Sequence, residues 1–358
     1  MRKLILFVTI ISLLCSCGRK GTPLNANEME QKLGSSVVLV KNEYYYTVDL
    51  GGLTIYFTGI DEDGDIANVE TELNEVKPAI SYGTGFFISD DGKIATNSHV
   101  VVPQVDEKSV KSNLSSLMEI LVGAYSEEVN KLSDQINELH NYWLRVPSGS
   151  DLEASIEEKR AEIKNERDED QAILDKLRMI NTANVNISTH SRIGIAQNDT
   201  HITSTSDFTD CVLIKDDSEH DLAVLQLKNK RLPEGCSFID ITRYDEKHEL
   251  APFDADGEYI DIDTPQLGEQ LYLLGYNLGP ALAITEQGIK AQITEGSISQ
   301  NTDDVKVMYT IPTLHGSSGS PVVDKYGNLI CVNFAGLDIT QNFNYGIKAK
   351  HLRNLVNK

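Results

Sequence analysis

The pattern that most restricts the fold of this chain is a succession of short apolar runs separated by turns rich in glycine, aspartate and asparagine. Residues 83–89 and 222–227 are examples of such runs. Many short strands with turn residues between them predict an antiparallel β-barrel or β-sandwich. Residues 44–48 and 53–58, which flank an Asp-Leu-Gly-Gly turn, predict a β-hairpin.

The strand-like pattern stops at about residue 105, where apolar residues begin to recur every three or four positions. One such segment ends at Trp143, and a second begins at Asp151, after a Pro-Ser-Gly-Ser break, and ends near Ile180. This spacing predicts two long helices that fold back on each other as an antiparallel hairpin. The hairpin is either a stabilising spine or a surface for a partner or for self-association, and the sequence favours neither.

The N-terminus has the features of an export signal. Arg2 and Lys3 precede an apolar run over residues 4–14 that is too short to span a bilayer. The run leads into Cys15-Ser16-Cys17, which resembles a bacterial lipobox, and this resemblance implies that Cys17 becomes the lipidated N-terminus. We expect a lipoprotein signal peptide over residues 1–16 and a tether over residues 17–30. The protein is then exported and anchored to a bacterial membrane, in the periplasm or at the cell surface; a plain secretory signal is the alternative.

Charge and cysteine content exclude several classes of function. The net charge of -22 opposes nucleic-acid binding, because phosphates are bound by patches rich in lysine and arginine. Cys211, Cys236 and Cys331 form an odd set without CxxC or zinc-finger spacing, so we expect no disulfide framework and no cysteine nucleophile. We also expect no metal or organic cofactor. The acidic segments 61–65 and 254–258 lack the glycine and glutamate spacing of an EF-hand, so we expect surface turns there.

Three residues in separate segments together favour nucleophilic catalysis. His99 directly follows a predicted strand, Asp221 opens another strand, and Ser318 lies in a glycine- and serine-rich loop. A serine hydroxyl becomes a good nucleophile when a neighbouring imidazole takes its proton, and histidine suits this role because its pKa is near neutrality. A buried aspartate fixes the tautomer of the imidazole. Each segment alone is weak evidence, but together they predict a Ser-His-Asp triad.

The loop around Ser318 also predicts an oxyanion hole. Gly316 and Gly319 allow a tight turn in which the backbone N–H groups of Gly316 and Ser318 face a developing negative charge. A lipase or esterase is disfavoured, because the G-x-S-x-G elbow requires an α/β sheet and a spacing that residues 316–319 lack.

The chain resembles trypsin-like bacterial serine peptidases, and the HtrA/Deg proteases most of all. The similar segments are residues 83–88, 96–101, 221–225, 268–276, 316–321 and 328–335. The resemblance implies a mostly β, chymotrypsin-like double antiparallel β-barrel of six strands each, with the α-helical hairpin inserted. The N-terminal barrel then comprises residues 31–103 and 181–235, the hairpin residues 104–180, and the C-terminal barrel residues 236–358.

The same resemblance implies a serine endopeptidase that cleaves exported or misfolded polypeptides through an acyl-enzyme. Pro312 and Thr313 correspond to the base of the primary specificity pocket, where no aspartate is placed to bind arginine or lysine. We therefore expect a small or medium apolar side chain before the cleaved bond. On the strand that lines the cleft, the substrate-binding positions correspond to Asn333, Phe334 and Ala335.

Departures from the family pattern lead to further expectations. Ser317 stands where a carboxylate or amide usually precedes the nucleophile, so we expect no activation by a new N-terminal ammonium group. We expect no PDZ domain, which leaves the helical hairpin to recognise substrate. The alternative is a membrane-anchored binding or scaffold protein of protease fold that uses the helical hairpin.

Overall fold

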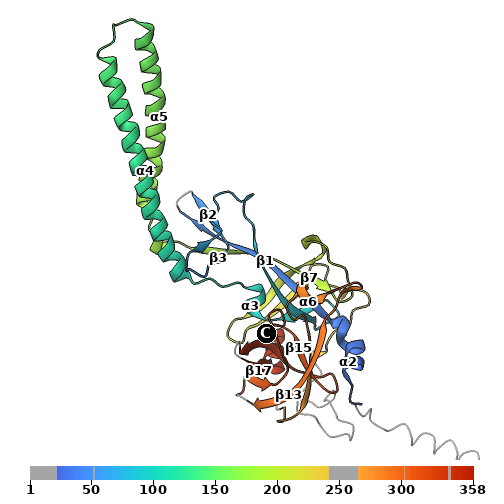
Figure 1. Cartoon of the computed structure of the whole chain (residues 1–358). Coiled ribbons are helices and arrows are strands. Elements are labelled where there is room, and N and C mark those ends of the chain that lie inside the picture. The colour runs from blue at the N-terminus through green and yellow to red at the C-terminus, as the bar shows by residue number, and fades with distance from the viewer. Residues whose placement is uncertain (1–21, 51–52, 242–264, 302, 338–339) are drawn as a thin grey trace, which may run out of the picture. The chain divides into compact units, whose positions relative to one another are not determined.

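The computed structural model describes residues 22–50, 53–241, 265–301, 303–337 and 340–358 (Figure 1). The signal peptide with Cys17 and the acidic segment 254–258 lie outside these residues. The chain divides into two compact units. The first unit is made of Met1–Glu43, Ile80–Pro103 and Ser191–Lys358, and the second of Tyr44–Ala79 and Gln104–His190.

The first barrel is built from strands that are neighbours in space but distant in sequence. In their order of pairing they are β1 (Val37–Asp49), β5 (Ala79–Phe87), β6 (Lys93–Thr96), β9 (Leu222–Leu227), β8 (Thr209–Asp217) and β7 (Ile187–Gln197). An additional pairing of β1 with β7 closes the ring. Every residue of β9 is buried, as expected for a strand with neighbours on both sides and apolar contacts on both faces.

The second barrel is closed as well and lies in the first unit. In their order of pairing its strands are β10 (Gln270–Gly275), β13 (Gln292–Asn301), β14 (Lys306–Tyr309), β17 (Thr340–Lys348), β16 (Leu329–Leu337) and β15 (Pro321–Asp324). Its interior is apolar and includes Leu271, Val307 and Tyr309. The double barrel predicted from the sequence is therefore confirmed.

Short elements accompany the strands of the second barrel. The amphipathic helix α7 (Ala349–Asn357) follows β17. Residues after β10 form a helical turn, α6 (Pro280–Ala283), followed by a short strand, β11 (Ile284–Thr285), which pairs with β12 (Gly288–Ile289). The reason for the helical turn is Pro280, whose restricted φ suits the first turn of a helix and whose missing N–H does not suit a ladder.

The second unit contains the helical hairpin that was predicted, formed by α4 (Glu107–Trp143) and α5 (Asp151–Met179), which run side by side in Figure 1. The Ser150 side chain caps α5 by accepting from the N–H of Glu153. Leu177 near the end of α5 packs with Leu114 near the start of α4, as an antiparallel arrangement requires. None of the described helices is long and apolar enough to cross a membrane.

Residues 44–79 belong to the helical unit, and their expected place in the N-terminal barrel is wrong. The predicted β-hairpin is present, because the end of β1 pairs with β2 (Thr54–Phe57), and β3 (Gly59–Ile60) pairs with β4 (Ile66–Ala67). The apolar face of this hairpin packs on the helices: Tyr46 and Phe57 share a buried cluster with Leu114. A strand pattern shows that a face is apolar but does not show which element covers it.

The expected tether is also partly wrong, because helix α2 (Ala26–Leu33) begins within it. Asn25 and Glu28 form a capping box, and Met29 and Leu33 are buried in the large core of the first unit. Two apolar residues are too few to establish a helical period from sequence. The remaining short elements are η1 (Gly34–Ser36), α3 (Ser98–Val101), η2 (Thr182–Asn184) and η3 (Thr205–Asp207).

Candidate active site

The three predicted triad residues come from both barrels of the first unit. His99 lies in α3, directly after β6; Asp221 lies between β8 and β9; Ser318 lies in the loop before β15. His99 Nδ1 is 2.7 Å from Asp221 Oδ2, and the backbone N–H of His99 donates to Asp221 Oδ1 at 2.9 Å. These two hydrogen bonds to the Asp221 carboxylate fix the His99 ring. Among the residues that the structure describes, Nε2 has no hydrogen-bond partner. The His99 side chain is 48% exposed, so a substrate can reach it.

Asp221 is held in an unusual backbone conformation by the segment that precedes His99. Its φ of 51° lies in the left-handed region, which costs a non-glycine residue energy and is common at functional sites. The fully buried Asn97 donates from Nδ2 to the carbonyl of Asp221 at 2.8 Å. The segment of His99 and Asp221 are therefore joined through backbone as well as side chain.

The loop that carries Ser318 is attached to strand β5 of the first barrel through Thr84. The N–H of Thr84 donates to the Ser318 carbonyl at 2.8 Å, and Thr84 Oγ1 donates to the Gly316 carbonyl at 2.8 Å. The same Oγ1 accepts from the N–H of Tyr276 at 2.9 Å. Thr84 is thus a positioning residue that brings Ser318 to the barrel of His99. Nothing in the sequence marks this role, because a threonine within a strand is ordinary.

Gly319 allows this close attachment. Its φ is 87°, and a Cβ at this position would collide with the carbonyl oxygen of Thr84 and with Thr96 Oγ1. Among the residues that the structure describes, no hydrogen bond joins His99 Nε2 to Ser318 Oγ. Catalytic hydrogen bonds often tighten only when a substrate is bound.

The backbone around Gly316 is where the sequence predicts an oxyanion hole. Gly316 has a φ of 92°, and a Cβ there would lie 2.6 Å from the Tyr276 carbonyl oxygen. The N–H of Leu278 donates to the His315 carbonyl at 2.5 Å, so in the trans peptide the N–H of Gly316 points the opposite way. Within the described part of the chain, neither this N–H nor that of Ser318 donates to a protein acceptor. Two such free donors are what a developing oxyanion requires.

The sequence predicts that Asn333 binds substrate, but in the structure its side chain is buried. It is 2% exposed, and its Nδ2 donates to the Ser317 carbonyl at 2.9 Å. Its Oδ1 accepts from the Tyr309 hydroxyl at 2.6 Å. Burial raises the pKa of Tyr309 well above its usual value, so this hydroxyl keeps its proton. Asn333 therefore positions the loop before the nucleophile, a role that depends on contacts between distant strands.

The other predicted substrate-binding residues lie on segments next to Ser318. Pro312 is exposed and Thr313 is partly buried, directly before the His315–Ser318 turn. Phe334 is partly buried and follows Asn333 on β16. Ala335 continues this strand, and its side chain lies outside the described residues. Substrate contact by these four residues stays a prediction.

The cysteines of the folded body, Cys211, Cys236 and Cys331, are free. Cys211 and Cys331 are buried and Cys236 is partly buried. Burial raises the pKa of Cys211 to about 12 and raises the pKa of Cys236 and Cys331 as well. A nucleophilic cysteine needs a lowered pKa, so none of these thiols is suited to catalysis.

Part of the chain is similar to a known protein family. Residues 173–332 match the trypsin-like peptidase domain family, a range that includes Asp221 and Ser318 and begins within α5. His99 precedes the matched range because the helical insertion separates it from Asp221. A comparison with curated proteins gives no match.

One similar solved structure is a serine endoprotease from Yersinia pestis, with 14% sequence identity and a TM-score of 0.43. The alignment covers 94% of this chain and 66% of that one. Residues 173–332 are thus similar to a trypsin-like peptidase domain, and this match, the closed barrels and the Asp221–His99 pair support a serine peptidase.

Proposed function

We propose that the protein is an endopeptidase that cleaves polypeptides through an acyl-enzyme, with His99 as base, Asp221 as orienting residue and Ser318 as nucleophile. The observation that carries the proposal is the double attachment of the Asp221 carboxylate to His99, at 2.7 Å and 2.9 Å. This attachment places the Nδ1 proton toward Asp221, so Nε2 is available as a proton acceptor.

In the first half of the reaction, Ser318 Oγ attacks the carbonyl carbon of the scissile bond while its proton passes to His99 Nε2. The carbonyl oxygen becomes an oxyanion and accepts from the N–H groups of Gly316 and Ser318. When the intermediate collapses, the C–N bond breaks and the leaving amine takes the proton from Nε2. In the second half, the oxygen of a water molecule attacks the acyl carbon of the Ser318 ester while His99 takes a proton from that water. The ester C–O bond to Ser318 then breaks, the acid product leaves, and the proton passes from His99 to Ser318 Oγ.

The proposal extends to the substrate and the location of the enzyme. We infer that the substrates are exported or misfolded polypeptides, because the N-terminal sequence has the features of an export signal. The base of the primary specificity pocket is assigned to Pro312 and Thr313, which precede the oxyanion-hole turn. The helical hairpin is the candidate surface for recognition of a substrate or of another copy of the chain.

Labelling with a fluorophosphonate tests the proposed chemistry. The probe reacts only with a serine activated by its base, so we expect one covalent adduct per chain, located on Ser318 by peptide mass spectrometry. Heat-denatured protein is the control and is expected to give no adduct. Denatured casein is expected to be cut at internal bonds. An unlabelled Ser318 together with uncleaved casein contradicts the proposal.

Acyl labelling tests the proposed membrane anchor. In a bacterial host fed an alkyne fatty acid, the wild-type chain is expected to carry the label and to sediment with membranes. Cys17→Ser is expected to lose the label, because a hydroxyl does not replace the thiol that accepts the lipid. Cys15→Ser is the matched control and keeps it, because Cys15 is removed with the signal peptide. Equal labelling of both variants speaks against the anchor.

A further inference from the structure

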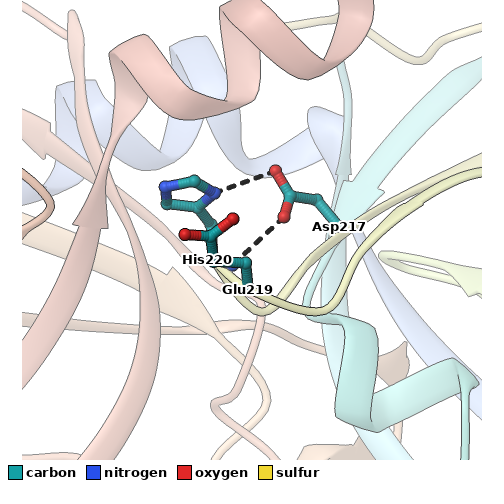
Figure 2. A group of neighbouring side chains, drawn as sticks. All are labelled: Asp217, Glu219 and His220. Carbon is teal, nitrogen blue, oxygen red and sulfur yellow. Dashed lines mark hydrogen bonds and ion pairs between the residues drawn. The ribbon is translucent and has the colours of Figure 1, made fainter.

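The turn between β8 and β9 carries a group of possible metal ligands that the proposed reaction does not use. Asp217, Glu219 and His220 each offer one ligand atom, and these atoms all lie within 4.8 Å of one another (Figure 2). The group occupies the turn that ends at Asp221, so its state bears on the backbone from which the orienting carboxylate of the triad projects.

The distance between Asp217 and His220 fits two ligands of one metal ion. Asp217 Oδ2 is 2.9 Å from His220 Nδ1, and Asp217 Oδ1 accepts from the backbone N–H of His220 at 3.2 Å. Two ligands bound at roughly 2.0–2.2 Å from a zinc ion lie about 3–3.5 Å apart. An ion can therefore replace the shared proton between Oδ2 and Nδ1 after a small movement, while Oδ1 keeps its bond to the backbone.

His351 holds the ring of His220 in place before any ion arrives. The two imidazole rings are stacked, with their centroids 4.2 Å apart and their planes at 24°. His351 Nε2 is in turn 3.2 Å from the carbonyl oxygen of Asp304. Contacts of this kind behind a ligand fix its orientation, so less conformational freedom is lost when a metal binds.

The surroundings leave room for an ion with bound water. A pocket of about 310 Å³ is lined by Asp217, His220, His351, Asn354, Asn357 and Lys358. The Asp217 and His220 side chains are 14% and 21% exposed, which is enough for access from solvent. Glu219 is exposed, and its side chain can turn toward the ion.

The donor set indicates the class of metal. Two carboxylates and a neutral imidazole offset a 2+ charge, and the nearby Lys358 reduces this gain. Mixed nitrogen and oxygen ligands suit zinc and related transition metals, whereas calcium and magnesium prefer oxygen alone.

We propose that Asp217, Glu219 and His220 form a binding site for a divalent transition metal of the zinc class, completed by water. The bound ion links both ends of the β8–β9 turn and stabilises the folded chain. This site is separate from the peptidase chemistry. The parent protein for the test is therefore the full chain with Ser318→Ala, in which metal binding does not depend on the proposed reaction.

Calorimetric titration with zinc chloride, on untagged protein stripped with EDTA, measures the site directly. We expect one zinc equivalent that is weakened by about 10-fold or more in E219Q and in H220Q. H201Q removes an exposed histidine elsewhere in the first unit and is the matched control, expected to bind as the parent does. Saturating zinc is also expected to raise the Tm of the parent by about 5 °C, and to raise that of H220Q less.

Glu219 is exposed, so E219Q tests the site without disturbing the core, even if H220Q fails to fold. Loss of the same zinc equivalent in E219Q, with H201Q unchanged, supports the site. A parent that binds no zinc overturns the proposal, as does equal binding by the parent, E219Q and H220Q, because the ion then lies elsewhere. Calcium at the same concentration is expected to leave the Tm unchanged, and a calcium response equal to that of zinc contradicts the assigned metal class.

Discussion

Replacement of Ser318 by alanine is expected to lower kcat for peptide hydrolysis by about 10⁴- to 10⁶-fold. The methyl group cannot attack a carbonyl carbon, so no acyl-enzyme forms. The hydrogen bonds of the loop to Thr84 and the free N–H groups of Gly316 and Ser318 use backbone atoms and stay in place. Substrate binding should therefore change little. The effect is measured as kcat and KM on a fluorogenic casein peptide.

Ser320→Ala is the matched control for this change. Ser320 lies in the same loop and is fully buried, and its Oγ has no hydrogen-bond partner among the described residues. Removing this hydroxyl is expected to leave kcat within about threefold of wild type, because surrounding contacts are kept. Equal activity of Ser318→Ala and wild type would contradict the assignment of the nucleophile. A Ser318→Ala chain that keeps the cellular role, when deletion of residues 105–180 abolishes it, would instead support the scaffold alternative.

Asp221→Asn is expected to lower kcat by about 10⁴-fold while leaving the fold intact. The structure gives the reason in atomic terms. Asp221 Oδ1 accepts from the backbone N–H of His99 at 2.9 Å, so the oxygen of the new amide occupies this position. Its NH₂ group then faces Nδ1, which must become an acceptor. The ring proton moves to Nε2, and His99 can no longer accept the proton of Ser318.

The measurement is kcat/KM together with the unfolding midpoint in urea. Asp210→Asn serves as the control, because Asp210 lies on β8 and pairs with Arg192 and Lys228 at the surface. Exposed ion pairs contribute about 0–1 kcal/mol, so this variant should keep its activity and most of its stability. If Asp210→Asn and Asp221→Asn lose activity equally, the loss reflects damage to the barrel and not the tautomer of His99.

The double barrel and the helical hairpin were predictable because their periodicities are local. Residues 222–227 are apolar except for Gln226, and the structure makes them a fully buried central strand. The apolar stripe ending at Trp143 became α4, and Ser150 caps α5 where the sequence predicted a helix start. Helix α2 was not predicted, because its two buried apolar residues, Met29 and Leu33, are too few to show a helical period. Residues 44–79 were assigned to the wrong unit, because a strand pattern does not show which element packs on its apolar face.

The sequence by itself determined the chemistry that is available: a histidine, an aspartate and a serine in suitable local contexts, with glycines around the serine. The tertiary structure alone decided how they meet. Thr84 attaches the Ser318 loop to the barrel of His99, and Asn333 turns inward to Ser317 instead of outward to a substrate. The physical reason is that these are hydrogen bonds between residues far apart in the chain. A residue's type shows what it can donate or accept, whereas only the fold determines which partner lies within reach.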